Sequence, residues 1–133
     1  MKQLILISHG NFCVELKKSA EMIMGPQENI HAVPLLPEDG QGDFLNKFNE
    51  TVKDMDDYVV FADLMGGTPA NTVSKEIMRG KKIQLYAGVN LPMVIEFVNS
   101  TMINQSSTYV DVAKDGIVNV NDVIAGNDDD EDE

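Results

Sequence analysis

Four short apolar runs alternate with longer segments of helical period over most of the chain. The runs lie at residues 3–7, 30–36, 58–62 and 83–87. Between them, apolar residues recur every three or four positions, as Cys13, Leu16 and Ala20 do. Strands that are apolar throughout are covered on both faces, and strands joined by helices pair in parallel. The pattern predicts an α/β fold, a doubly wound open parallel sheet with helices on both faces.

Proline and capping residues punctuate this pattern. Pro34 interrupts the second run, and because proline cannot donate to a sheet ladder, we expect this strand at an edge. Thr68 followed by Pro69 predicts a helix start with Thr68 as the N-cap. Asn90 and Asp43 are predicted to cap two further helices.

The last part of the chain has a weaker pattern. Residues 108–113 are rich in β-branched and small side chains, and both a strand and a short helix remain open for them. From Ile117 to Ile124, apolar residues are interspersed with asparagine and aspartate. Such spacing favours a strand at a sheet edge, and we expect an antiparallel one.

Composition limits the classes of partner. The formal charge is −12, and the run from Asp128 to Glu133 contributes six of the 22 acidic residues. We expect one domain at 1–126 and a disordered, solvated acidic tail at 127–133, with a docking role for the tail as the alternative. Nucleic acid and anionic membrane surfaces require a basic face, so neither is an expected partner.

Cysteine content and hydropathy predict a cytoplasmic protein. Cys13 is the only cysteine, which fits a reducing compartment, and we expect it in the core. No run approaches the ~20 apolar residues of a membrane span, and the apolar run near the N-terminus is too short for a signal peptide. His9, His31 and Cys13 make no metal-ligand motif, and no phosphate-loop or dinucleotide fingerprint occurs, so no metal or cofactor is expected.

Two reactive groups follow neighbouring apolar runs. His9 comes directly after the first run, and Asp63 follows the third. The carboxyl ends of parallel strands share one edge of the sheet, where ligands bind in α/β folds, so we expect the two side chains to meet. A carboxylate on one imidazole nitrogen orients the ring and leaves the other nitrogen as a nucleophile.

A loop suited to an anion follows the aspartate. Gly66 and Gly67 allow close backbone approach, and the helix start at Thr68 offers amide groups that its own helix does not use. Together with His9 and Asp63, these residues indicate a histidine that accepts a phosphoryl group. From the pattern alone, a turn histidine and an ordinary glycine turn remain competing interpretations. His31, inside a predicted strand, is interpreted as structural.

At these positions the chain resembles the IIA component of the mannose family of the bacterial sugar phosphotransferase system. The resemblance spans roughly residues 2–100. The matching pieces occur in order and are Ile7-Ser8-His9-Gly10, Ser19-Ala20-Glu21-Met22-Ile23-Met24-Gly25, Gln27-Glu28-Asn29, Asp63-Leu64-Met65-Gly66-Gly67-Thr68-Pro69-Ala70-Asn71 and Gly88-Val89-Asn90-Leu91-Pro92-Met93.

The resemblance implies a phosphoryl relay. His9 corresponds to the histidine that accepts phosphate from the phosphocarrier HPr and passes it to the IIB component, which serves sugar uptake through the membrane components IIC and IID. Asp63 corresponds to the aspartate that holds the ring, and Gly67 and Thr68 to the loop that contacts phosphate. Met22 corresponds to a pocket residue. A homodimer that exchanges its last strand, and a IIB partner on a separate chain, are also implied.

Four further residues complete the expected pocket, and three other functions remain open. Leu64 and Leu91 should form an apolar rim together with Met65, and Asn90, which directly precedes Leu91, is expected in the same pocket. The alternatives are a phosphocarrier subunit that feeds dihydroxyacetone kinase, a small hydrolase or isomerase with a His–Asp base, and a regulatory binding module. The complete piece at 88–93 favours the sugar-transport branch, without indicating which sugar.

Overall fold

The computed structural model describes residues 1–103 and 108–131, and side chains as far as residue 126. The strands are β1 (Gln3–His9), β2 (Ile30–Leu35), β3 (Tyr58–Ala62) and β4 (Gln84–Ala87). The helices are α1 (Phe12–Met24), α2 (Gln41–Val52), α3 (Thr68–Met78), α4 (Leu91–Met102), α5 (Tyr109–Asp115) and α6 (Val120–Glu131). All strand pairings are parallel, in the order β2-β1-β3-β4. The predicted α/β class with a parallel sheet is confirmed.

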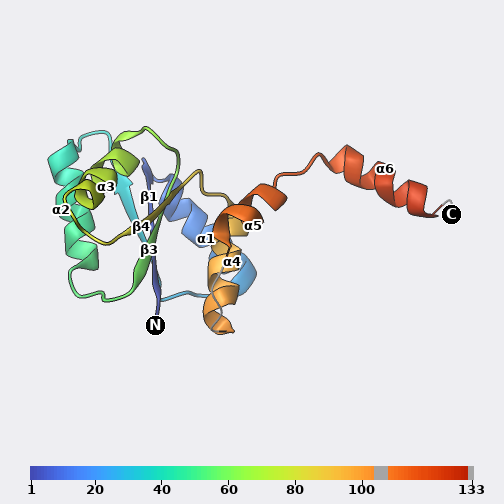
Figure 1. Ribbon diagram of the computed structural model, residues 1–133, viewed down its shortest axis with the longest axis horizontal. Coiled ribbons are helices and arrows are strands. Elements are labelled where there is room, and N and C mark those ends of the chain that lie inside the picture. The colour runs from blue at the N-terminus through green and yellow to red at the C-terminus, as the bar shows by residue number, and fades with distance from the viewer. Residues whose placement is uncertain (104–107, 132–133) are drawn as a thin grey trace.

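Helices cover both faces of the sheet. Figure 1 shows α2 and α3 on one side and α1, α4 and α5 on the other. Successive side chains of a strand point to opposite faces, so β1 supplies both cores. Leu4 and Leu6 pack in the cluster under α1, α4 and α5, whereas Ile5 and Ile7 pack in the cluster under α2 and α3. All four are fully buried, which explains why the run is apolar throughout.

The strand order positions the two predicted reactive groups. β1 is central and pairs with β2 and β3, in register from Gln3 with Tyr58 to Ile7 with Ala62. β2 is an edge strand, as Pro34 predicted. β1 runs two residues beyond the predicted end because Ser8 and His9 still pair with β2.

Helix starts differ in detail from the sequence prediction. Asn90 caps α4, accepting a hydrogen bond from the amide of Met93 at 3.1 Å, as expected. Gly67, not Thr68, is the N-cap of α3, so Thr68 is the first helical residue. Asp43 lies within the first turn of α2 and accepts the Gly40 amide at 2.9 Å. Its carboxylate reaches back to the N-cap backbone instead of serving as the cap itself.

The C-terminal part corrects one prediction. Residues 109–115 form helix α5, which settles the ambiguity at 108–113. The strand predicted at 117–124 is absent from the described residues, where α6 begins at Val120. A strand needs a partner for its backbone groups, and the described part of this segment pairs with no strand of the sheet, so a helix satisfies them internally. Every described apolar side chain from 117 to 124 is exposed: Ile117, Val118, Val120, Val123 and Ile124.

α6 extends away from the rest of the molecule in Figure 1 and ends at Glu131. The acidic tail at 127–133 lies largely beyond the described side chains, and its disorder stays a prediction. Among the described residues, no helix is long and apolar enough to cross a membrane.

Candidate functional site

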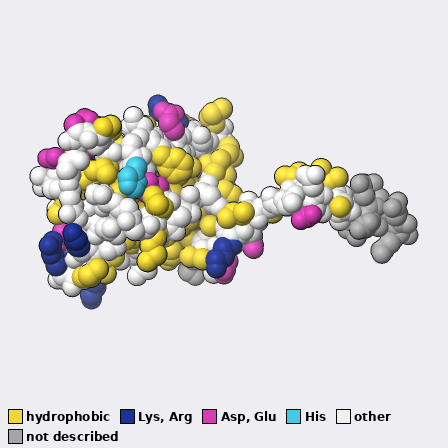
Figure 2. Space-filling view, turned by 90° about the horizontal axis from the view of Figure 1, so that it is seen from above, with side chains coloured by type: hydrophobic (Ala, Val, Ile, Leu, Met, Phe, Trp, Pro, Cys, Tyr) yellow, Lys and Arg dark blue, Asp and Glu magenta, His cyan; other side chains and the backbone are white. Residues whose placement is uncertain are grey.

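His9 and Asp63 meet at the carboxyl ends of β1 and β3. His9 is the last residue of β1, and Asp63 directly follows β3. Their side chains approach to 2.7 Å between His9 Nδ1 and Asp63 Oδ2. The histidine side chain is 48% exposed, whereas the aspartate is only 13% exposed. Figure 2 shows an exposed histidine side chain on the face seen from above, with hydrophobic side chains beside it. The predicted pair therefore exists, with the imidazole outermost.

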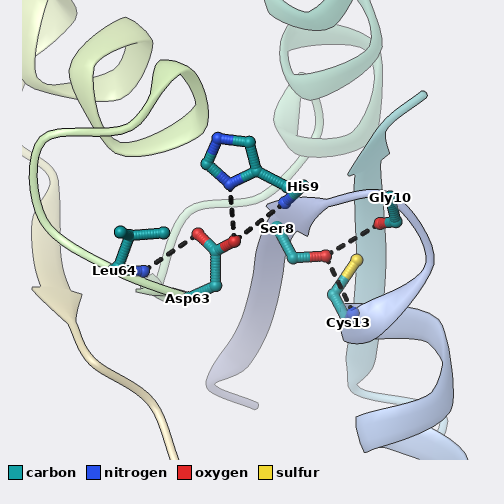
Figure 3. A network of polar contacts seen from close by, with 6 residues as sticks. All are labelled: Ser8, His9, Gly10, Cys13, Asp63 and Leu64. Carbon is teal, nitrogen blue, oxygen red and sulfur yellow. Dashed lines mark hydrogen bonds and ion pairs between the residues drawn. The ribbon is translucent and has the colours of Figure 1, made fainter. Parts of the chain in front are cut away.

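The carboxylate of Asp63 holds His9 at two points (Figure 3). Oδ2 accepts from the His9 backbone amide at 2.9 Å as well as from the ring, and Oδ1 accepts from the Leu64 amide at 2.9 Å. Burial alone raises the pKa of Asp63, but the hydrogen bonds from His9 and Leu64 outweigh it and lower the pKa. An ionised carboxylate can only accept, so Nδ1 donates and Nε2 carries the lone pair.

Gly67 packs directly against the imidazole. A Cβ built on Gly67 would lie 2.4 Å from His9 Cε1 and 3.0 Å from Nε2, so a side chain at this position would displace the ring. The close approach places the N-terminus of α3 beside Nε2. Gly66 has φ +88°, a conformation that glycine adopts without strain. The first amides of α3, beginning at Thr68, have no acceptor in their own helix, and they lie at the positive end of the helix dipole. Both features suit an anion on Nε2.

The remaining predicted pocket residues divide into two groups. Leu64 is 49% exposed and directly follows Asp63, the residue that holds the His9 ring. Asn90 has structural partners, the Met93 amide at Oδ1 and the Ala113 carbonyl at Nδ2. Leu91 packs against the core beneath α1 and α4. Asn90 thus links the start of α4 to α5, and Leu91 lies against the core cluster.

Met22 is not brought to the pocket. It lies in the last turn of α1 and is 89% exposed. The start of α1 is the end that adjoins His9, and ten residues of helix separate Met22 from that start, or about 15 Å at 1.5 Å per residue. α1 runs away from the carboxyl edge of the sheet, which places Met22 at its far end. Any role of Met22 at the site requires a surface that the single chain does not form.

The two structural residues behave as predicted. His31 Nε2 lies 2.7 Å from Gln3 Oε1 on the neighbouring strand, and burial lowers the pKa of His31. Cys13 is buried, which raises the pKa of its thiol. Within residues 1–103 and 108–126, no cluster of three or more His, Cys, Asp or Glu side chains could hold a metal ion.

Two residues near the site carry contacts that sequence reasoning left unassigned. The side-chain amide of Asn71 donates to the Gly66 carbonyl at 3.1 Å and so holds the glycine loop. The Ser8 hydroxyl accepts from the Cys13 amide and donates to the Gly10 carbonyl, within the turn that follows His9. In the sequence, only their position indicated such a role, because each is a small polar residue close to a predicted site residue.

Comparisons with known proteins agree on one family. A family model described as "PTS system fructose IIA component" (EIIA-man) matches residues 3–114. The fructose-specific EIIA component of Bacillus subtilis is 32% identical over 102 residues, which cover 74% of this chain and 70% of that protein. The mannose-specific EIIAB component of Escherichia coli is 29% identical over 96 residues, 70% of this chain but 30% of that protein.

Solved structures agree with the sequence relatives. The phosphotransferase system component EIIA of Streptococcus agalactiae superimposes with a TM-score of 0.81 at 32% identity. The match covers 91% of this chain and 98% of that one.

Proposed function

The chain belongs to the EIIA-man family of sugar phosphotransferase system IIA components, and from this we propose that it carries a phosphoryl group on His9 Nε2. The proposed donor is phosphorylated HPr and the proposed acceptor is a IIB component, for sugar uptake through membrane components. The observation that carries the proposal is the hydrogen bond from Nδ1 to Asp63, which orients an exposed ring with Nε2 beside Gly67.

The transfer step follows from this geometry. The Nε2 lone pair of His9 attacks phosphorus, the bond between phosphorus and the donor's imidazole nitrogen breaks, and its electron pair stays on the donor. The His9 ring keeps its Nδ1 proton and becomes positively charged, and the Asp63 carboxylate, 2.7 Å away, stabilises that charge. The amides at the start of α3 stabilise the phosphoryl oxygens. Passing the group to IIB reverses the same movements.

The exposure of His9 favours a relay between proteins. A donor and an acceptor histidine or cysteine must each reach Nε2, and a side chain that is 48% exposed allows this. Leu64 and Met65, 49% and 87% exposed, supply apolar surface from the loop that follows Asp63. Apolar side chains around an exposed reactive centre suit the core of a protein–protein contact. A small hydrolase would instead enclose its substrate in a pocket around the base.

Phosphorylation by the general system tests this proposal. The protein is incubated with phosphoenolpyruvate, the general phosphotransferase enzyme and HPr, and acid-labile phosphate is mapped by mass spectrometry at neutral to basic pH. We expect one phosphate on His9, none on His9→Gln, and wild-type labelling of the matched variant His31→Gln. Labelling of His9→Gln would remove His9 from the role. Turnover of small phosphoesters without partner proteins would favour the hydrolase, and offering purified IIB or dihydroxyacetone kinase decides the acceptor.

We also propose that two copies exchange their C-terminal segments in a homodimer. β4 is an edge strand of the described sheet, and a groove of ≈ 470 Å³ runs beside it. Its lining is Met65, Gly66, Ala70, Asn71, Ser74, Leu85, Tyr86, Ala87 and Val110. The exposed apolar side chains of 117–124 need cover, and an open strand edge offers unpaired backbone groups. Residues 117–124 of one copy would cover β4 of the other.

The domain assignment and location complete the proposal. Residues 1–126 would act as the phosphocarrier domain, and 127–133 as a solvated tail that takes no part in transfer. Donor and acceptor proteins of this system operate in the cytoplasm, so we place the protein there, associated with IIC and IID only through IIB.

A further inference from the structure

Ser8 is a polar residue at a fully buried position of β1. Its side chain has no exposed surface, whereas the next residue, His9, is exposed. Side chains alternate along a strand, so Ser8 points to the face that holds Leu4 and Leu6, toward α1. His9 points to the other face, where Gly67 at the start of α3 meets its ring. Figure 3 shows the two side chains turned in different directions from adjacent positions.

Both hydrogen-bonding functions of the Ser8 hydroxyl are used. Its oxygen accepts from the Cys13 amide at 2.8 Å, and its proton goes to the Gly10 carbonyl at 2.9 Å. Cys13 is in the first turn of α1, and Asn11, the N-cap residue, makes no side-chain cap. Ser8 therefore takes over the capping of α1 from outside the helix, satisfying one of its unpaired amides.

The two bonds close a loop around His9. Gly10 turns the chain with φ +56°, and its amide donates to the Leu35 carbonyl at 2.7 Å. The Ser8 hydroxyl holds the carbonyl of the same residue. The backbone on both sides of His9 is thus fixed to β2 and to α1. The His9 amide can then point at Asp63 Oδ2, the atom that also accepts from its ring.

We propose that Ser8 is a positioning residue for phosphoryl transfer, whose hydroxyl joins the turn after His9 to α1 and thereby holds the imidazole against Asp63 and Gly67. The inference rests on the proposed function of His9, because positioning matters only if the ring reacts. Without the hydroxyl, the Cys13 amide and the Gly10 carbonyl lose their partners, and the turn can relax. Misplacing a reacting atom by about 1 Å can cost about 100-fold in rate.

The test compares Ser8→Ala with Ser8→Thr, which keeps the hydroxyl, and with the matched control Ser100→Ala. Ser100 is also buried, at 5% exposure, and its hydroxyl donates to the Phe97 carbonyl at 2.9 Å in α4. The first readout is the rate of phosphate uptake from phosphorylated HPr. The second needs no partner: the ring ¹⁵N signals of His9 report its tautomer, and those of His31 provide an internal reference. Melting temperature is measured for every variant.

For Ser8→Ala we expect a rate about 10- to 100-fold lower and partial loss of the Nδ1–H tautomer. Ser8→Thr should keep the wild-type tautomer and most of the rate, and Ser100→Ala should lose stability only. If Ser8→Ala melts lower but keeps both the tautomer and the rate, Ser8 is merely structural and the inference is overturned. If Ser8→Ala does not fold, Ser8→Cys, with a weakly bonding thiol, takes its place in both measurements.

The outcomes separate this inference from the proposed function. A wild-type protein that shows the Nδ1–H tautomer but takes no phosphate would contradict the relay, and the tautomer comparison would still decide whether Ser8 orients the ring. A wild-type protein that is phosphorylated while Ser8→Ala behaves identically would contradict only the role of Ser8.

Discussion

The corner around His9, formed by Ser8, His9, Asp63 and Gly67, differs from the segment from Ile117 to Ile124 in how its polar and apolar groups are partnered. At the corner, the Asp63 carboxylate accepts three hydrogen bonds, and the buried Ser8 hydroxyl has both its donor and its acceptor engaged. In the C-terminal segment, every described apolar side chain is exposed. The polar groups of the corner find their hydrogen-bond partners within one chain. The apolar side chains of the C-terminal segment are not buried by that chain.

This difference indicates where each region obtains its structure. The corner lies where β1 and β3 end side by side, so sheet pairing brings its groups together without help from another molecule. The C-terminal segment adjoins no strand, and its helix satisfies the backbone but buries no apolar face. An apolar segment left exposed in this way marks an interaction surface. This difference agrees with the proposed roles, in which His9 carries the phosphoryl group and residues 117–124 contact a second copy.

Deleting residues 117–133 is the strongest challenge to this comparison. We expect the wild-type protein to be a dimer and the deletion to be entirely monomeric, because the deletion removes the segment proposed to cover β4 of the partner. The His9 tautomer should be unchanged, since the corner is complete in one chain. Sedimentation velocity and ring ¹⁵N signals measure the two effects. Deleting only 127–133 is the control and should leave the dimer intact. A monomeric wild type, or a dimeric deletion, would contradict the assembly role.

Gly67→Ala tests the close approach at the corner. Because its Cβ would lie 2.4 Å from His9 Cε1, the ring must move away from the start of α3. We expect phosphate uptake to fall about 100-fold. Gly42→Ala is the matched control: Gly42 lies in α2 with open space around it, and alanine there should raise helix stability by about 1 kcal/mol without changing the rate. Unchanged uptake by Gly67→Ala would mean that the ring does not react from this position.

Asp63→Asn should change stability with a predictable pH dependence. The pKa of Asp63 is lowered in the folded state, so its charge stabilises the fold above the carboxyl's unfolded pKa, and this contribution is lost as pH falls through the folded pKa. We expect the variant to be on the order of 1 kcal/mol less stable at pH 7, with the difference disappearing in acid. Urea unfolding at a series of pH values measures it. A difference that grows toward low pH would reverse the sign and contradict the assignment.

Much of the fold and of the site could be predicted because the relevant signals are local. The apolar run that ends at His9 and the one that ends before Asp63 indicate buried parallel strands, and parallel strands end at a common edge. Pro34 likewise marked β2 as an edge. The start of α3 was predicted one residue late, because Thr68 and Gly67 are both acceptable N-caps and only the backbone conformation decides between them.

The remaining differences concern contacts between segments that are distant in sequence. Asn90 was expected in the pocket, but its amide donates to Ala113 in α5. Met22 lies at the far end of α1. The sequence did not show this, since the direction of that helix relative to the site appears only when the helix packs on the sheet. The residues at 117–124 have a pattern suited to a strand, but a strand also needs another strand to pair with, and the pattern does not show whether one is adjacent.

The sequence by itself determined the alternation of strands and helices from β1 to α4, the apolar cores and the position of His9 and Asp63 at strand ends, since periodicity and residue type act over a few neighbouring positions. The tertiary structure decided which oxygen of Asp63 holds the ring, how closely Gly67 approaches that ring and how Ser8 joins two elements. These contacts depend on distances of a few ångströms between segments that are distant in sequence and come together only when the sheet forms.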